Sequence, residues 1–187
     1  MNALEKAVRN LCGEICWDAC YTQYFNMGLT FGLPRLEVLP KPMLRSARAF
    51  GRRSKRRFLK RTVLIKGQWR VSLGMAYWKV LHKGEPIATS TSSARNIRMA
   101  LWLLEGQRME SVTVNPRTGA TTFCFDLDCV LRVRRMRADG TNDVWSLTGP
   151  RGQLIMVYGN GSFERGRTSD PLEYTKTMGV RFAAPRR

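Results

Sequence analysis

The sequence contains the stretch Ala100-Leu101-Trp102-Leu103-Leu104-Glu105-Gly106, an apolar run that ends on a glycine. A similar pattern occurs 93 residues earlier, at Ala7-Val8-Arg9-Asn10-Leu11-Cys12-Gly13. Both stretches read as the last turns of a helix, because apolar residues recur at helical spacing and glycine commonly ends a helix. The match predicts an internal duplication in which each half of the chain begins with a helix.

The match continues beyond the two expected helices. Three further pairs of segments correspond in chain order: Leu29–Phe31 with Phe123–Phe125, Leu36 and Val38 with Leu131 and Val133, and Lys66–Val71 with Asn142–Leu147. The last pair places Trp69 at the position of Trp145, but its offset is only 76 residues. The first half should therefore hold about nineteen residues that the second half lacks.

Apolar alternation and turn residues predict a run of antiparallel strands after each helix. In the first half we expect a helix over residues 3–11 and strands at 15–19, 29–31, 62–66, 69–75 and 78–81. In the second half the hydroxyl residues 89–93 supply a helix N-cap, and strands are expected at 111–114, 121–125, 130–133, 144–147 and 154–158.

These elements predict an α+β protein. It should consist of two tandem helix-plus-antiparallel-meander units, packed with pseudo-twofold character, with a basic loop inserted in the first. The expected domains are residues 1–88 as the first unit with its basic insertion at 45–61, residues 89–170 as the second unit, and residues 171–187 as a C-terminal tail.

The formal net charge of +18 is concentrated in one part of the chain. Between Val38 and Gly84 there are fourteen Lys and Arg and no Asp or Glu. Nine of these cations lie within the insertion: Arg45, Arg48, Arg52, Arg53, Lys55, Arg56, Arg57, Lys60 and Arg61. Arginine predominates, and its planar guanidinium suits phosphate groups and stacked bases. A solvated loop that only aids solubility is the alternative interpretation of such a run.

A second group of cations, Arg132, Arg134 and Arg135, falls on an expected strand of the second unit. If the pseudo-twofold brings this strand close to the base of the insertion, the two groups form one continuous positive surface. We therefore expect these three residues and the nine cations of the insertion to contact nucleic-acid phosphates.

The sequence offers little for catalysis or metal binding. Cys12, Cys16 and Cys20 do not have the spacing of a structural zinc site, and without an export signal five cysteines predict reduced, mostly buried thiols. The single histidine, His82, has no evident partner, and Asp126 with Asp128 is more typical of a turn than of a metal site. We expect no catalytic residues, no metal and no cofactor.

The function that these patterns favour is a non-enzymatic, cytoplasmic accessory protein that binds RNA or DNA, with a protein complex containing that nucleic acid as a further partner. The expectation includes no membrane, because no run of about 18 apolar residues occurs. The alternative function is a protein-binding module or immunity-type inhibitor with an acidic bacterial partner. The salt dependence of binding distinguishes the two functions, because phosphate contacts weaken steeply as the salt concentration rises.

Overall fold

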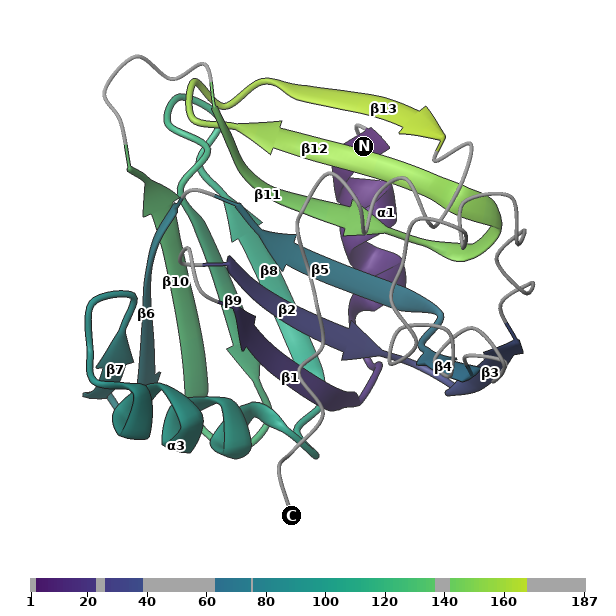
Figure 1. The fold of residues 1–187 in the computed structure, drawn as a ribbon. Coiled ribbons are helices and arrows are strands. Elements are labelled where there is room, and N and C mark those ends of the chain that lie inside the picture. Colours follow the sequence, from purple (N-terminus) through teal and green to yellow (C-terminus); the bar gives the residue numbers. More distant parts are fainter. Residues whose placement is uncertain (1–2, 23–25, 39–62, 75, 137–141, 168–187) are drawn as a thin grey trace, which may run out of the picture.

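The computed structural model describes residues 3–22, 26–38, 63–74, 76–136 and 142–167. Most of these residues belong to antiparallel sheets, and two α-helices accompany them in the described part of the chain. The protein is therefore α+β in class and mainly β, as the sequence predicts at this coarse level. Figure 1 shows the two larger sheets facing one another, with a helix at each of two open sides.

The first half of the chain forms, in order, α1 (Ala3–Leu11), β1 (Cys16–Thr22), β2 (Asn26–Phe31), β3 (Arg35–Val38), β4 (Val63–Lys66), β5 (Trp69–Leu73), β6 (Ala76–His82) and β7 (Glu85–Thr89). The second half forms α3 (Ala94–Leu104), β8 (Met109–Val114), β9 (Thr121–Phe125), β10 (Cys129–Arg135), β11 (Asp143–Thr148), the 3-10 turn η2 (Pro150–Gly152), β12 (Gln153–Tyr158) and β13 (Phe163–Arg167).

Both helices form where their sequences predict them. The hydroxyl of Ser93 caps α3 by accepting a 3.4 Å hydrogen bond from the Asn96 amide. Gly13 (φ 91°) and Gly106 (φ 85°), which lie just after α1 and α3, adopt left-handed backbone conformations that glycine reaches without steric cost. Neither described helix is long and apolar enough to span a bilayer.

Each of the two larger sheets takes strands from both halves of the chain. The six-stranded sheet has the order β1-β2-β5-β11-β12-β13, and the five-stranded sheet has the order β7-β6-β10-β9-β8. The halves meet where β5 pairs with β11 in one sheet and where β6 pairs with β10 in the other. The strands of each half are thus divided between the sheets rather than folded into a self-contained meander.

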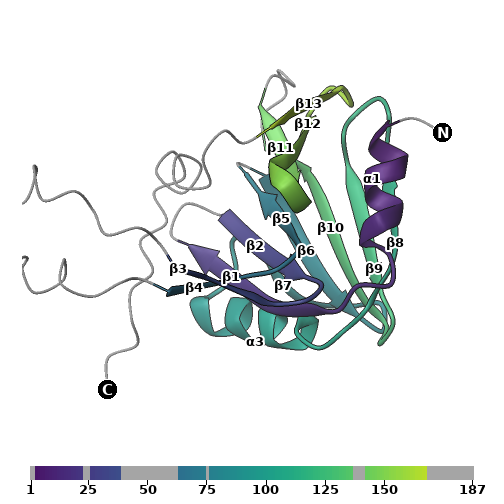
Figure 2. The ribbon, with the colours of Figure 1, turned by 90° about the vertical axis from the view of Figure 1, so that its right-hand side faces the viewer.

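Apolar and aromatic side chains fill the space between the sheets. The rings of Phe123 (β9) and Trp145 (β11) meet edge to face with centroids 5.4 Å apart, and Phe31 stacks on Phe125 at 6.5 Å. The helices complete this core: α3 contacts β1 and β7, an edge strand of each sheet, and α1 contacts β8 (Figures 1 and 2).

A reciprocal set of backbone hydrogen bonds joins the segments that follow the two helices. Gly13 donates to the Met109 carbonyl at 2.7 Å, and Gly106 donates to the Cys16 carbonyl at 2.7 Å. The Cys16 amide donates to Gln107 at 2.9 Å, and the Met109 amide donates to Glu14 at 3.0 Å. The first bond corresponds to the second and the third to the fourth: in each pair of bonds, a residue of one half is replaced by the residue 93 positions away in the other half, the offset found in the sequence match.

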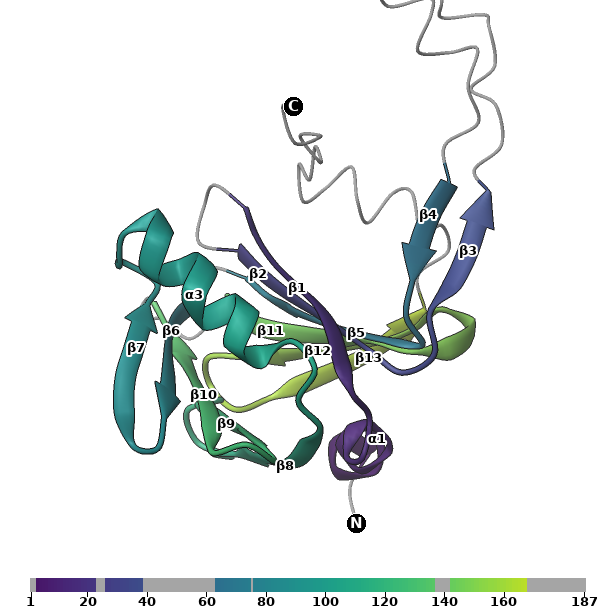
Figure 3. The same cartoon turned by 90° about the horizontal axis from the view of Figure 1, so that it is seen from below.

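The strands β3 and β4 form a separate two-stranded hairpin that projects from the body of the protein (Figure 3). Residues 39–62 connect its strands and include the insertion at 45–61, which lies outside the described residues. The sequence match of Leu36 with Leu131 is wrong, because Leu36 on the hairpin is 72% exposed and Leu131 in β10 is fully buried.

The expected equivalence of Trp69 and Trp145 is also wrong. Trp69 pairs with Phe31 of β2, whereas Trp145 pairs with Leu73, near the other end of the strand that holds Trp69. The similar sequences around the two tryptophans therefore belong to adjacent strands of one sheet.

The sequence pattern does not predict two edge strands, β7 and β13. Proline in β7 argues against an interior strand and is tolerated here because β7 lies at the edge of its sheet. In β13 four of the five residues are exposed, so apolar alternation is absent. The expected tail at 171–187 lies outside the described residues.

Candidate nucleic-acid interface

Two of the three arginines expected on the second basic strand lie together on the outer face of the five-stranded sheet. Along β10, Leu131 and Val133 point into the core, and Arg132 and Arg134 are exposed on the opposite face. Arg135 falls on the same side of β10 as Leu131 and Val133, and its Nη1 donates a 3.1 Å hydrogen bond to the Gly159 carbonyl. Arg135 therefore supports the loop after β12 and is not part of the outer face.

The strand register aligns one residue from each of the five strands into a transverse row across this outer face. We call it the donor row: Thr113, Thr122, Arg132, Lys79 and Thr89. All five side chains can donate hydrogen bonds, two carry positive charge, and none is acidic. Four strand spacings give the row a length of about 19 Å.

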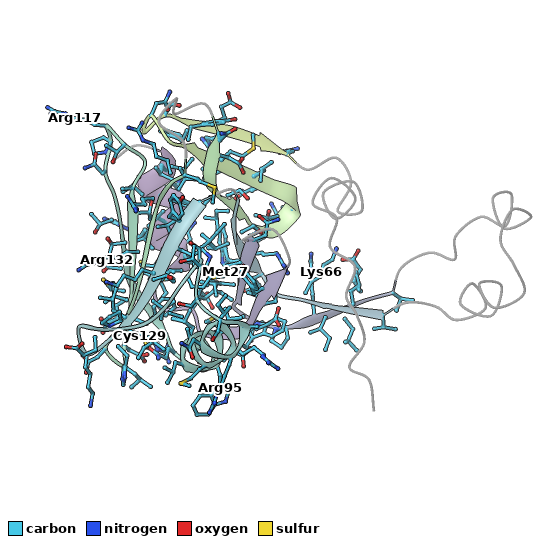
Figure 4. The ribbon with its side chains drawn as sticks, turned by 60° about the vertical axis from the view of Figure 1, so that its left-hand side comes forward. Met27, Lys66, Arg95, Arg117, Cys129 and Arg132 are labelled. Atoms are coloured by element: carbon cyan, nitrogen blue, oxygen red, sulfur yellow. The ribbon has the colours of Figure 1, made fainter. Side chains whose placement is uncertain are left out.

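A second pair adds an aromatic ring beside the donor row. Arg134 pairs with Tyr77 of β6, and its guanidinium carbon lies 5.1 Å from the centre of the Tyr77 ring. A cation over an aromatic face is attracted by the quadrupole of the ring, so the contact orients Arg134 while leaving Tyr77 37% exposed. Figure 4 shows Arg132 on this side of the protein, away from the six-stranded sheet.

The outer face of the six-stranded sheet has a different character. Its comparable transverse row consists of Cys20, Gly28, Ser72, Ser146, Met156 and Glu164. This row contains no cation and ends on a carboxylate. The donor row therefore differs from this row in charge, although the six-stranded sheet also carries cations, among them Arg70, whose guanidinium contacts the Cys20 sulfur at 3.5 Å, and exposed Arg165 and Arg167 on β13.

The structure does not bring β10 close to the base of the projecting hairpin. The hairpin extends from β2 and β5 of the six-stranded sheet, and β10 lies in the other sheet, on the opposite side of the protein in Figures 2 and 3. The hypothesis of one continuous surface between them is therefore wrong for the described residues. The nine cations Arg45, Arg48, Arg52, Arg53, Lys55, Arg56, Arg57, Lys60 and Arg61 lie outside the described residues.

The cysteines occupy ordinary structural positions. Cys16 and Cys129 are buried thiols, and Cys16 and Cys20 lie on β1, beyond the helix that would have aligned them with Cys12. Burial, reinforced by the nearby carboxylates of Glu105 and Asp18, raises the pKa of Cys16 to about 12, which disfavours the reactive thiolate.

The acidic pair of the sequence lies in a turn, as expected. Asp126 and Asp128 fall between β9 and β10, and Asp126 accepts a 2.8 Å hydrogen bond from the Arg108 amide. Within the described ranges, no group of three or more His, Cys, Asp or Glu side chains is placed to hold a metal ion.

No protein-family model, curated protein or solved structure matches this chain. The candidate interface therefore depends on the geometry of the sheet. Sequence reasoning missed Lys79 and Tyr77, although alternation around buried Trp78 indicates that both neighbours face outward. It could not place them beside Arg132 and Arg134, because that requires the pairing of β6 with β10.

Proposed function

We propose that the protein is a non-enzymatic, cytoplasmic accessory protein that binds nucleic acid through the donor row. The observation that carries the proposal is the alignment of Arg132 and Lys79 between threonines on one row of the sheet. Phosphate oxygens accept hydrogen bonds from guanidinium, ammonium and hydroxyl groups alike, so the row matches a phosphate backbone.

The cations of the insertion supply a second contact in this proposal. Residues 45–61 carry nine positive charges, and they attach through the projecting hairpin on the other side of the protein from β10. The two regions act as separate contacts on one long polyanion, and linking two contacts raises affinity when one strand reaches both. Because backbone contacts carry no sequence information, we expect RNA and DNA of mixed sequence to bind.

The test is a charge-matched comparison. The variant Lys79→Ala, Arg132→Ala, Arg134→Ala removes three cations from the face, and the control Arg117→Ala, Arg165→Ala, Arg167→Ala removes three exposed cations elsewhere. Affinity for a labelled 20-nucleotide oligomer is measured over a range of salt. The face variant should flatten the slope of log affinity against log salt by about 0.7 to 0.9 for each phosphate no longer bound, more than the control. Equal slopes in the two variants would refute the interface.

A protein-binding module or immunity-type inhibitor is the second candidate, and one observation favours it. Four aliphatic side chains on one face of the hairpin are more than half exposed: Leu36, Val38, Val63 and Ile65. An apolar patch of this kind binds a protein partner through interactions that survive high salt. Capture of a protein partner at high salt, abolished on changing Leu36 and Ile65 to Ser, would favour this candidate.

We also propose that the two halves arose by duplication and are related by a pseudo-twofold axis. The reciprocal hydrogen bonds between residues 13–16 and 106–109 support this, as does the division of strands between sheets. Under this axis β6 corresponds to β11 and β5 to β10. The pairing of Trp78 with Val133 in one sheet then matches the pairing of Trp145 with Leu73 in the other. The whole segment 32–68 is then extra, since only residues 126–128 separate β9 from β10.

A further inference from the structure

The helix α3 presents an unusual set of side chains on its outer face. Trp102 is 71% exposed and Met99 is 47% exposed, and Arg98 and Arg95 lie one and two turns before Trp102 on the same stripe. The opposite face, with Ile97, Ala100, Leu101 and Leu104, is buried. Trp102 and Met99 together form an exposed apolar patch beside two cations, and such a patch suits contact with a ligand.

The charge of this stripe indicates what kind of ligand fits. The helix contains two arginines and no acidic residue, and Glu105, which follows it, accepts a 3.0 Å hydrogen bond from the Ala19 amide. Arg98 is positioned on the helix by a 3.3 Å hydrogen bond from its Nε to the Ala94 carbonyl. A ligand that contacts Trp102 therefore also meets two cations, which favours an anionic ligand with a flat apolar part.

The donor row ends beside the turn that begins α3. The row ends at Thr89 on the edge strand β7, and the Thr89 amide donates a 2.9 Å hydrogen bond to the Ser92 hydroxyl in the turn that begins α3. Only residues 90–93 separate the end of the row from the helix. Figure 4 labels Arg132 on the sheet and Arg95 on the helix below it. A chain that follows the row past β7 thus reaches α3.

We propose that Trp102 stacks on an unpaired base of a single-stranded nucleic acid, while Arg95 and Arg98 bind the adjoining phosphates. The inference rests on the proposed function and makes it more specific. A stacking contact needs a base free of its partner, so the protein binds single strands more tightly than duplexes. Met99 forms an apolar border beside the base.

The experiment compares three ligands: a single-stranded 20-mer, a 20-mer of the same charge with abasic residues, and the duplex. Trp102→Ala should bind the single-stranded 20-mer about tenfold more weakly than the wild-type chain does, and Trp102→Phe should retain most of the wild-type affinity. Neither variant should change the affinity for the abasic 20-mer or the duplex. Because the side chain is exposed, the variants should unfold at the wild-type denaturant midpoint.

The fluorescence of Trp102 gives a second measurement. Of the five tryptophans it is by far the most exposed, so external quenching by iodide reports mainly on it, and the single strand should protect it. If Trp102→Ala binds the single strand as tightly as the wild-type chain does, this inference is overturned, while the donor row remains the proposed interface. A wild-type chain that binds none of the ligands would overturn both, and protection of Trp102 by a protein instead would overturn the inference and assign α3 to a protein contact.

Discussion

The indole nitrogen of Trp145 donates a 2.7 Å hydrogen bond to the hydroxyl of Thr121, and this bond crosses from one sheet to the other. Both residues are buried, and the Thr121 hydroxyl itself donates to the Gly119 carbonyl at 2.9 Å. In the same core, the indole nitrogen of Trp78 has no hydrogen-bond partner among the described residues. The Trp145–Thr121 bond is thus a polar link between β11 and β9 inside a largely apolar core.

Removing the acceptor should destabilise the protein. Thr121→Val keeps the shape of the side chain but leaves the buried indole N–H unpaired, which costs about 1 to 3 kcal/mol in the free energy of unfolding. Thr121→Ser keeps the hydroxyl and should lose less. Urea denaturation of the two variants and the wild-type chain measures the difference. If the Thr121→Val variant were as stable as the Thr121→Ser variant, the hydrogen bond would contribute nothing to the stability of the core.

Ionisation of Cys16 should make the protein less stable in alkali. The folded state keeps this thiol protonated up to a pKa of about 12, against an ordinary pKa of 9.0 for an exposed thiol. The resulting stabilisation is fully present below pH 9 and is lost as pH rises towards 12, because the unfolded chain then releases a proton that the folded chain retains.

The variant Cys16→Ala isolates this effect. Its free energy of unfolding should lie below that of the wild-type chain at about pH 8 because of poorer packing, and the gap should narrow by about pH 10.5. Cys20→Ala, at a partly exposed position on the same strand, serves as the control. A gap that stays constant over this range would mean that water reaches the Cys16 thiol.

The fold should not need the segment between β2 and β5. Replacing residues 32–68 with Asp-Leu-Asp, the link that joins β9 to β10, should leave one cooperative unfolding transition because β2 and β5 are antiparallel neighbours like β9 and β10. Circular dichroism during thermal unfolding measures this. Loss of the cooperative transition would show that the segment is part of the core and would count against the duplication.

The basic insertion should contribute to binding without contributing to the sheets. Changing Arg52, Arg53, Arg56 and Arg57 to Ala should lower affinity for RNA and DNA and flatten the salt dependence by about 0.7 to 0.9 for each phosphate that the variant no longer binds. The unfolding midpoint serves as the control and should not change. An affinity equal to that of the wild-type chain on both polymers would reduce the insertion to a solvated loop.

The local elements could be predicted because their signals are local. The bounds of α1 follow from apolar spacing, and the Ser93 cap and the turns after β8 and β9 follow from residues with known preferences. The outward position of Arg132 and Arg134 also follows, from alternation along a single strand.

The partners of the strands could not be predicted in this way. The pairings of β5 with β11 and of β6 with β10 join strands that lie far apart in the sequence, and nothing in either strand encodes its partner. For this reason the sequence does not place Lys79 beside Arg132. The sequences around Trp69 and Trp145 are similar because each tryptophan is followed by a polar residue and then an apolar one, a pattern that many strands share.

The division of strands between the sheets also affects how the chain folds during synthesis. Strands β5 and β6 are made well before β11 and β10, and until then the pairing edges of both remain open. At about 5 to 20 residues per second the delay is on the order of ten seconds, during which apolar side chains such as Val71 and Val80 lack their final neighbours. The nascent chain therefore passes through an aggregation-prone stage on the ribosome, and slower elongation between codons 89 and 148 would lengthen it.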